Sequence, residues 1–209
     1  MGKWLHWAIE IQSLAQAGLA YTDNVYDIER YERLREIAAE MINEKSDIPL
    51  DKVKDLFCCE TGYQTPKLDT RAAIFKNGKI LLVHENNGTW SLPCGWCDVL
   101  ESVESNTLKE VREETGLEAR TVRLISVQDR NKHNKPIYAY GVCKVFVLCE
   151  VIGGKFEENI ETTEIRYFSP DELPENLAEE KTIREQIEMC FEAYKQGILE
   201  YNLALKLFL

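Results

Sequence analysis

The chain has 209 residues, of which 44% are apolar, and a formal net charge of −11 at pH 7. This length is enough for one domain with an extension. The acidic excess argues against nucleic acid as a partner, because phosphate contacts need a basic face, whereas a small anionic substrate held through metal ions is still compatible.

Cysteine usage and hydropathy indicate the compartment. The seven cysteines are an odd number and follow no disulfide-like spacing. The first residues, MGKWLHWAIEIQ, contain no signal-type apolar core, and no segment is long enough to span a bilayer. We therefore expect a soluble cytoplasmic protein with reduced thiols and no membrane partner.

The N-terminal part of the chain is predicted to be helical. Apolar residues recur at helical spacing in three segments, 4–19, 28–41 and 50–57. Three amphipathic helices that include Trp4 and Trp7 cannot bury both of their faces alone, so they need the downstream domain or a second copy of the chain. We expect a homodimer, and favour core or interface packing of both tryptophans over stacking on a base.

A polar segment with Gly and Pro, 58–66, breaks the helical period and marks a domain boundary. We predict a helical extension over 1–62 and a second domain over 63–209. The adjacent cysteines in this segment, Cys58 and Cys59, are interpreted as incidental.

Beyond the boundary the pattern changes to strands. Segments 69–76 and 79–85 flank Asn77-Gly78, the strongest short hairpin signal. Downstream we expect strands over 121–128, 137–152 and 165–168, a polar loop over 129–135 and a helix over 182–194. The apolar end, 203–209, should dock on the body or on another subunit. Strands on both sides of a central helix indicate an α/β or α+β sandwich with a mixed sheet.

The central helix carries the densest acidic cluster in the chain. Ser102 can cap its start and Gly116 can end it. Glu110, Glu113 and Glu114 stand at i, i+3 and i+4, so their carboxylates share one face and repel one another. Three oxygen donors suit a hard cation such as Mg²⁺ or Mn²⁺. The alternative is a solvated acidic face.

The spacing around these glutamates resembles the Nudix box. Gly95 is followed after five residues by Glu101, and after seven more by the run KEVREETGL, 109–117. Lys109 stands where the general signature has Arg, a departure shared by the subgroup named below. Flanking segments extend the resemblance over about 67–195. It implies an α/β/α Nudix sandwich with a mixed sheet, preceded here by a small all-helical domain.

The resemblance also implies metal-dependent hydrolysis of a nucleoside diphosphate linked to a group X. Glu110 and Glu114 match direct metal ligands, Glu113 ligates directly or through water, and the backbone carbonyl of Cys94 matches another ligand position. Glu101 would orient the cluster, with Lys109 as its partner.

A general base is needed within reach of the attacking water. In the family it comes from the box or from a loop after it. Glu161 and Glu164 are the loop candidates. We prefer Glu161, because Glu164 immediately precedes a predicted strand. A solvated loop charge is the alternative for Glu161.

Three further residues are candidates for substrate binding. Arg71, on the first predicted strand, is the natural diphosphate-binding cation, with an exposed strand charge as the alternative. Glu85 and Asp98 are predicted to lie at the same opening of the site as Arg71, and they are candidates to contact metal or ribose. Trp90 and Trp96 are interpreted as core residues rather than base-stacking residues.

The helical extension is similar to a subgroup that includes bacterial CDP-choline pyrophosphatases and some ADP-ribose pyrophosphatases. Pro136 lies further past the box than the proline that marks many ADP-ribose hydrolases. We therefore rank CDP-choline-like and other pyrimidine-diphosphate compounds slightly above ADP-ribose, with sugar nucleotides behind. The alternatives are a Nudix ligand sensor or scaffold without turnover, and a hydrolase acting on RNA ends.

The C-x-x-C pair of Cys94 and Cys97 supports a rival hypothesis, either a redox pair or half of a zinc site. His84 and His133 are isolated, which argues against zinc. A thioredoxin-type pair should open a helix, whereas this pair precedes the helix by several residues, which argues against a redox role.

Overall fold

The structure is a computed structural model that describes residues 3–45, 49–57 and 61–196. Its contacts divide the chain into two compact units, residues 1–66 with 137–141 and residues 67–136 with 142–209. The domain boundary predicted after residue 62 stays a prediction. Segments 58–60 and 203–209, for which we also made predictions, lie outside the described residues.

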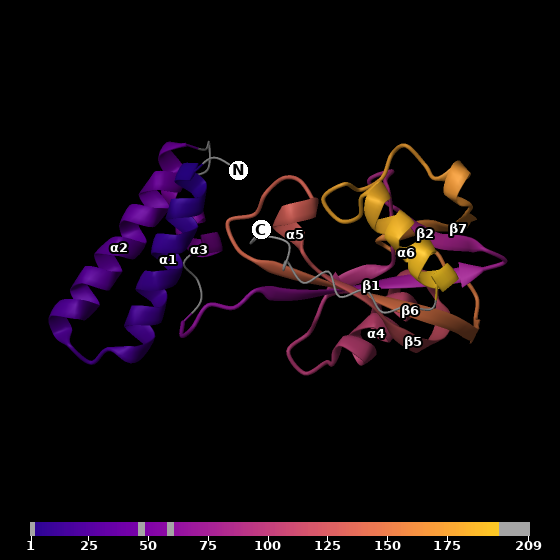
Figure 1. Cartoon of the computed structure of the whole chain (residues 1–209), viewed down its shortest axis with the longest axis horizontal. Helices are drawn as coiled ribbons and strands as arrows, with labels where there is room; N and C mark the ends of the chain where they lie inside the picture. Colours follow the sequence, from indigo (N-terminus) through magenta and orange to yellow (C-terminus); the bar gives the residue numbers. More distant parts are fainter. Residues whose placement is uncertain (1–2, 46–48, 58–60, 197–209) are drawn as a thin grey trace. The chain divides into compact units, whose positions relative to one another are not determined.

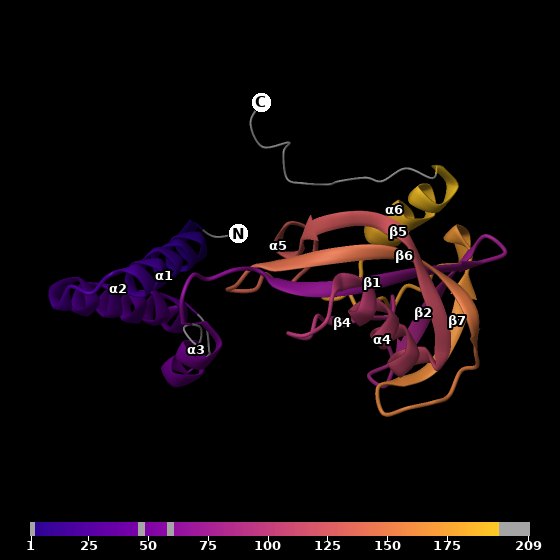
Figure 2. The same cartoon turned by 90° about the horizontal axis from the view of Figure 1, so that it is seen from below.

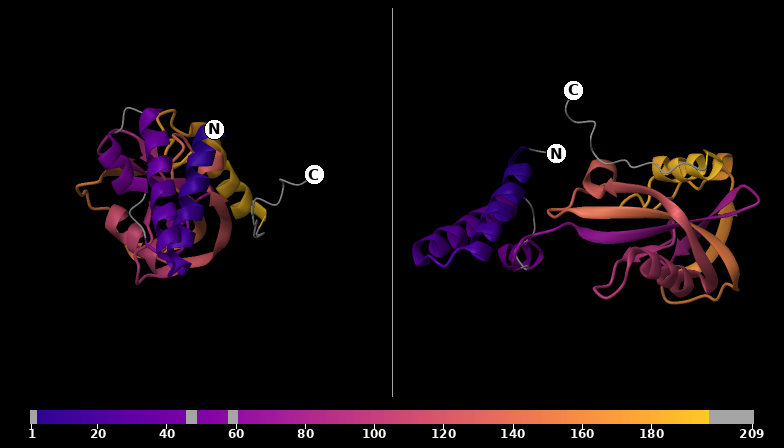
Figure 3. Two further views of the ribbon diagram at one scale, coloured as in Figure 1. Left: turned by 90° about the vertical axis from the view of Figure 1, so that its left-hand side faces the viewer. Right: turned by 60° about the horizontal axis from the view of Figure 1, so that its bottom comes forward.

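The first unit is built from three helices, as predicted: α1 (Lys3–Tyr21), α2 (Val25–Glu44) and α3 (Leu50–Phe57). Helices α1 and α2 lie side by side (Figures 1 and 3), and α2 starts where the Asn24 side chain accepts hydrogen bonds from two backbone N–H groups of its first turn. The small core of this unit contains Ala8, Ala38, Ala39, Ile42 and Val53.

One part of the predicted strand 137–152 is wrong. Residues 137–141 belong to the helical unit, where Ala139 packs against the core, and the strand begins only at Val142. Gly141 interrupts the apolar run, and the residues before and after it pack into different cores, a difference that a periodicity argument does not detect.

The second unit contains a seven-stranded mixed sheet. Its strands are β1 (Lys67–Lys76), β2 (Lys79–Glu85), β3 (Trp90–Ser91), β4 (Cys94–Trp96), β5 (Leu117–Asp129), β6 (Val142–Gly154) and β7 (Thr162–Phe168). The order is β3-β2-β1-β6-β5, with β4 paired to β1 and β7 paired to β2. Strands β1 and β6 are parallel, and the other pairs are antiparallel.

The predicted hairpin between β1 and β2 is confirmed. Asn77 and Gly78 have positive φ angles of 51° and 75°, the conformation that a two-residue hairpin turn with right-handed strand twist requires. The register that follows sets Phe75 opposite Ile80.

Two helices cover the sheet from opposite sides, α4 (Val103–Thr115) and α6 (Arg184–Gln196), as Figure 2 shows. Side chains alternate along β1: Ala72 and Ile74 share a core with Val111 of α4, whereas Ala73 shares one with Ile187 of α6. This alternation follows from the period of two in a strand. The predicted α/β/α sandwich with a mixed sheet is therefore confirmed.

Smaller differences from prediction lie near the loops. The polar segment 129–135 contains a short helix, α5 (Arg130–His133), because the Asp129 side chain caps it by accepting from the Asn131 N–H. A 3₁₀ turn, Pro170–Glu172, precedes the last helix, which starts two residues later than predicted. Among the described helices, none combines the length and the apolar run that a membrane crossing requires.

Candidate active site

Helix α4 presents the acidic cluster, and its ends are fixed locally. Ser102 and Ser105 form a reciprocal capping box at the start. Gly116 adopts a left-handed conformation, with φ at 68°, and its N–H donates to the Arg112 carbonyl. Val111 is fully buried against the sheet. Burial of Val111 fixes the orientation of α4 about its own axis, and this orientation sets the directions in which Glu110 and Glu114 point.

Glu110 lies directly against Gly95 on β4. A Cβ atom at position 95 would come within 2.4 Å of the Glu110 carboxylate, so a larger residue there would have to displace that carboxylate. Burial raises the pKa of Glu110, and the neighbouring charge of Glu113 adds to this shift while Lys109 opposes it.

Glu114 is the most buried carboxylate of the cluster. Its Oε2 accepts a hydrogen bond of 3.0 Å from the backbone N–H of Cys94. Burial raises the pKa of Glu114 to about 8, although this N–H opposes the shift. The helix and the strand before the box are thereby joined at the Cys94 backbone.

The partner predicted for Lys109 is wrong. The ammonium group lies 2.9 Å from an Asp98 oxygen, 3.4 Å from Glu113 and 3.7 Å from Glu110, and the ion pairs described for it do not include Glu101. A lysine is a compact point charge, so it gathers several carboxylates instead of clamping one in a planar contact. The exposed Glu101 donates its backbone N–H to the Asp98 carbonyl at 2.9 Å.

The donor set was tested against a divalent cation. Within the described ranges, no three Asp, Glu, His or Cys side chains already surround one point as a metal site would. The chemistry of Glu110, Glu113 and Glu114 nevertheless fits a hard cation, since all donors are carboxylate oxygens. Burial and mutual repulsion disfavour the ionised forms of Glu110 and Glu114, and a bound cation would relieve that cost.

Glu85 lies on the other side of the site, at the end of β2. It accepts hydrogen bonds from Ser91 Oγ at 2.8 Å and from Asn87 Nδ2 at 3.3 Å. It also pairs with Lys181 at 2.9 Å. Sequence reasoning missed Lys181, because it is a single cation in an acidic segment without a motif.

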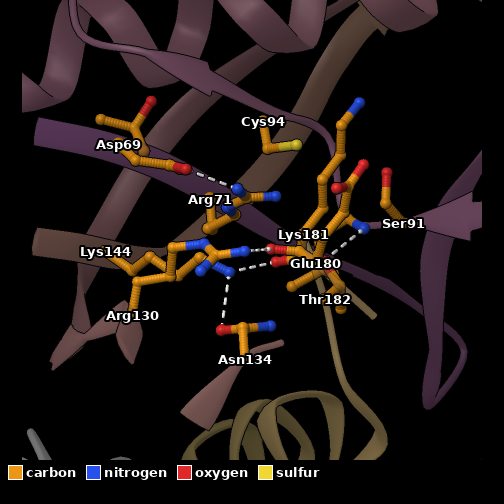
Figure 4. Close-up of polar contacts among 12 residues, drawn as sticks. Asp69, Arg71, Ser91, Cys94, Arg130, Asn134, Lys144, Glu180, Lys181 and Thr182 are labelled. Carbon is orange, nitrogen blue, oxygen red and sulfur yellow. Dashed lines mark hydrogen bonds and ion pairs between the residues drawn. The ribbon is translucent and has the colours of Figure 1, made fainter. Parts of the chain in front are cut away.

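Arg71 is buried, with 3% of its surface exposed, so the alternative of an exposed strand charge is wrong. Its Nη2 donates to Asp69 Oδ2 at 2.5 Å, as Figure 4 shows. Its Nε and Nη1 have no hydrogen-bond partner among the described residues and are shielded from solvent. A buried guanidinium with donors left over is costly, which favours an acceptor supplied from outside.

Asn159 connects the Glu161 loop to helix α4, and sequence reasoning missed this residue too. Its side-chain nitrogen donates to the carbonyls of Glu113 and Glu114, at 3.0 and 3.3 Å. Its side-chain oxygen accepts from the Glu161 N–H at 2.9 Å. Glu161 is exposed, whereas Glu164 pairs with Arg166 at 2.6 Å.

The structure separates the two tryptophans near the box. Trp90 is buried and meets Phe168 edge-on, with ring centroids 5.0 Å apart, as predicted for a core residue. Trp96 is 47% exposed, so its interpretation as a core residue is wrong. It is the last residue of the short strand β4, along which burial decreases from Cys94 to Trp96.

Cys94 and Cys97 are free thiols. Burial raises the pKa of Cys94 to about 12, and burial also raises that of Cys97. A redox or nucleophilic cysteine needs the opposite shift, because the thiolate is the reactive form. The rival redox hypothesis therefore gains no support from the electrostatics of this pair.

Comparison with known proteins decides the family. Residues 66–189 match the family described as the NUDIX domain. The chain belongs to the Nudix hydrolase family. Residues 2–57 match a second family, described as a UDP-X-like N-terminal oligomerisation domain. Helix α4 thus lies within the NUDIX match, and helices α1 to α3 lie within the second match.

Individual Nudix relatives span most of the chain. The YjhB protein of Bacillus subtilis, provisionally named an ADP-ribose pyrophosphatase, is 40% identical over 191 residues, which cover 91% of each chain. The crystal structure of an ADP-ribose pyrophosphatase from Streptococcus suis 89-1591 is 49% identical, with a TM-score of 0.61, over 66% of this chain and 98% of that one.

The crystal structure of a UDP-X diphosphatase includes the helical unit. It is 34% identical, has a TM-score of 0.63, and covers 95% of this chain and 97% of its own. Together these relatives identify the enzyme class as Nudix pyrophosphatase, a phosphoanhydride hydrolase.

Proposed function

We propose that this Nudix enzyme hydrolyses the diphosphate bond of nucleoside diphosphate-X compounds in a reaction that depends on Mg²⁺ or Mn²⁺. The observation that carries the proposal is the set of three glutamates on α4, one of which, Glu110, places its carboxylate directly against Gly95. Nudix hydrolases generally need a divalent metal, and the oxygen donors here suit one.

We propose Glu110, Glu113, Glu114 and the carbonyl of Cys94 as the residues that hold the cation. When bound, the cation would lower the pKa of a water molecule and neutralise charge on the diphosphate. Exposed Glu101 borders the loop that carries Asp98, and we propose that it orients the cluster.

Glu161 is our proposed general base. Asn159 fixes its backbone beside the end of α4, and the side chain is exposed and free to turn toward a substrate. Glu164 is already paired with Arg166, which supports the choice between the two.

Arg71, Glu85 and Asp98 are the proposed substrate-binding residues. The unpartnered Nε and Nη1 atoms of Arg71 offer donors to a phosphate oxygen. Glu85 and Asp98 are each held by a lysine, Lys181 and Lys109 respectively, so both carboxylates are oriented before a ribose or metal arrives.

The relatives favour particular substrates. Two are named for ADP-ribose and one for UDP-X compounds, so we propose ADP-ribose and uridine diphosphate compounds beside CDP-choline, whose support is the sequence resemblance alone. The full set of glutamates argues against a sensor or scaffold without turnover.

A substrate panel tests the function. ADP-ribose, UDP-glucose, CDP-choline, nucleoside triphosphates and a capped RNA would be incubated with Mg²⁺ or Mn²⁺, and products resolved by mass. We expect a nucleoside monophosphate from at least one diphosphate-X compound, and loss of turnover with a chelator that added Mg²⁺ reverses. Cleavage of triphosphates or RNA ends alone would overturn the substrate class.

A homodimer is our proposed assembly. Trp7, Leu14 and Tyr21 are 53%, 65% and 78% exposed and stand seven residues apart along α1, so they line one side of the helix as a coiled-coil seam does. The match to an oligomerisation domain over residues 2–57 supports a second copy as the occupant of this stripe. Free thiols among the described cysteines fit the proposed cytoplasmic location.

A further inference from the structure

Residues 179–181, before α6, form a segment in which each backbone carbonyl accepts a hydrogen bond from a side chain, and we call it the fixed segment. Asn134 Nδ2 donates to the Glu179 carbonyl at 2.7 Å, Arg130 Nη2 donates to the Glu180 carbonyl at 3.2 Å, and Lys144 Nζ donates to the Lys181 carbonyl. Three successive backbone oxygens are therefore each bound by a different side chain. Arg130 belongs to α5, Asn134 follows the end of α5, and Lys144 belongs to β6. Figure 4 shows these side chains beside the segment.

These contacts are made from inside the protein. Arg130 is 2% exposed and Lys144 is fully buried. Lys144 also donates to Asn134 Oδ1 at 2.9 Å, so the holding groups are linked to one another. Burying cations is costly, and burial lowers the pKa of Lys144 to about 7. A loop that only connects two elements of the fold would not require buried cations to bind its backbone carbonyls.

The fixed segment presents one side chain to the active site. Lys181 pairs with Glu85 at 2.9 Å, and its charge lowers the pKa of Cys94 and of Glu114, although burial outweighs this and raises both. The Lys181 side chain is 40% exposed. Its ammonium group thus lies at Glu85, which also accepts from Ser91, and it extends from a backbone held by three side-chain hydrogen bonds.

The other cations at this site are placed differently. Arg71 offers its unpartnered Nε and Nη1 atoms from a buried position, and Lys109 already lies among Asp98, Glu110 and Glu113. Lys181 combines solvent access with a flexible stem, the form in which lysine binds phosphoryl oxygens as a point charge. Lys181 also neutralises Glu85, whose side chain is only 11% exposed, so the test of a binding role needs a readout that loss of this pair alone would not move.

We infer that Lys181 contacts the diphosphate of the substrate, and that Asn134, Arg130 and Lys144 are positioning residues that place it. This inference rests on the proposed function, because it names the residue that meets the diphosphate at the same site. Release of the ammonium group from Glu85 toward the phosphoryl oxygens would exchange one ion pair for another.

Turnover of neutral variants is the first test. Lys181→Met and Lys181→Gln should lower kcat/KM by about 10- to 100-fold, the range for a lost hydrogen bond to a charged group, and Lys181→Arg should restore part of it. The control is Lys79→Met, since Lys79 is 45% exposed, close to the 40% of Lys181, and makes a 2.8 Å pair with Glu172, which is more exposed than Glu85. The control should stay within about twofold of the wild type.

Binding of methylenediphosphonate, a diphosphate that cannot be hydrolysed, gives a second readout without turnover. Calorimetry in Mg²⁺ should show binding weaker by about tenfold in Lys181→Met and unchanged in Lys79→Met. If Lys181→Met matches the control in both assays, the inference is overturned and the proposed function is untouched. If the wild type cleaves no diphosphate-X compound but Lys181→Met alone loses the phosphonate, the proposed function fails and the inference stands.

A double-mutant cycle tests the positioning residues. Lys144→Met should lower kcat/KM, and adding it to Lys181→Met should cost no further activity, because the residue that it places is already gone. Independent, multiplicative losses would show that Lys144 supports only the fold and would overturn the positioning role.

Discussion

Gly95 and Glu110 are in direct contact across β4 and α4, at a distance that excludes any Cβ atom at position 95. Gly95→Ala must therefore move the Glu110 carboxylate, which is the far end of a flexible side chain, so the fold should survive. We expect turnover to fall by about 100-fold, the effect of a misplacement near 1 Å. Steady-state kinetics with circular dichroism would check both parts.

Gly153→Ala is the matched control for that variant. A Cβ atom at Gly153 would also meet a glutamate carboxylate, that of Glu118, at 3.1 Å. Glu118 lies outside the acidic cluster, so activity should not change. Equal losses in the two variants would attribute the effect to the backbone instead of to Glu110.

Glu114→Gln should reduce Mg²⁺-dependent turnover by orders of magnitude while leaving the fold intact. The amide oxygen can still accept from the Cys94 N–H, but the charge that a cation needs is removed. Glu118→Gln, on the exposed part of β5, serves as the control. Unchanged turnover in Glu114→Gln would exclude α4 as the catalytic centre.

Glu161→Gln and Glu164→Gln distinguish the two candidate bases. Loss of a general base lowers kcat by about 10²- to 10⁴-fold, and we expect this for Glu161 alone. Glu164 pairs with Arg166, so its replacement should change kcat by no more than a few-fold. The reverse order in single-turnover assays would transfer the role to Glu164.

Lys144 predicts a particular dependence of stability on pH. Its pKa is lowered to about 7 by burial, whereas the unfolded chain has an ordinary lysine. Between about pH 7 and pH 10 the unfolded state binds a proton that the folded state has released, so the free energy of unfolding should rise by up to ~1.4 kcal/mol per pH unit from this group. Below about pH 7 both states are protonated and the contribution is constant.

Urea denaturation of the wild type and of Lys144→Met, at about pH 6.5 and about pH 9, measures this effect. The stability of the wild type relative to the variant should increase with pH, because the variant has no group to titrate at that position. Parallel changes in the two proteins would show that Lys144 keeps its charge in the fold.

Leu14→Glu should weaken the proposed homodimer. A carboxylate in the middle of an apolar seam loses its water without gaining a partner, so we expect the dissociation constant to rise by about tenfold or more. Sedimentation velocity reports the assembly. Val122→Glu places the same charge at an apolar residue of β5 that is 51% exposed, and it should leave the assembly unchanged.

The caps of α4 and the β1–β2 hairpin were predictable, because each depends on residues close together in sequence. The same local rules identified the three N-terminal helices. They failed at residues 137–141, where an apolar run divides between two cores.

The sequence by itself determined the acidic helix and its caps, since a helical period and capping residues at fixed positions suffice for these. Only the tertiary structure decided that Arg71 is buried, that Lys109 pairs with Asp98, and that Lys181 stands beside Glu85. Those contacts join segments that are distant in sequence, through the pairing of β1 with β4 and through the fixed segment before α6. A local sequence pattern does not specify which side chains this pairing brings together.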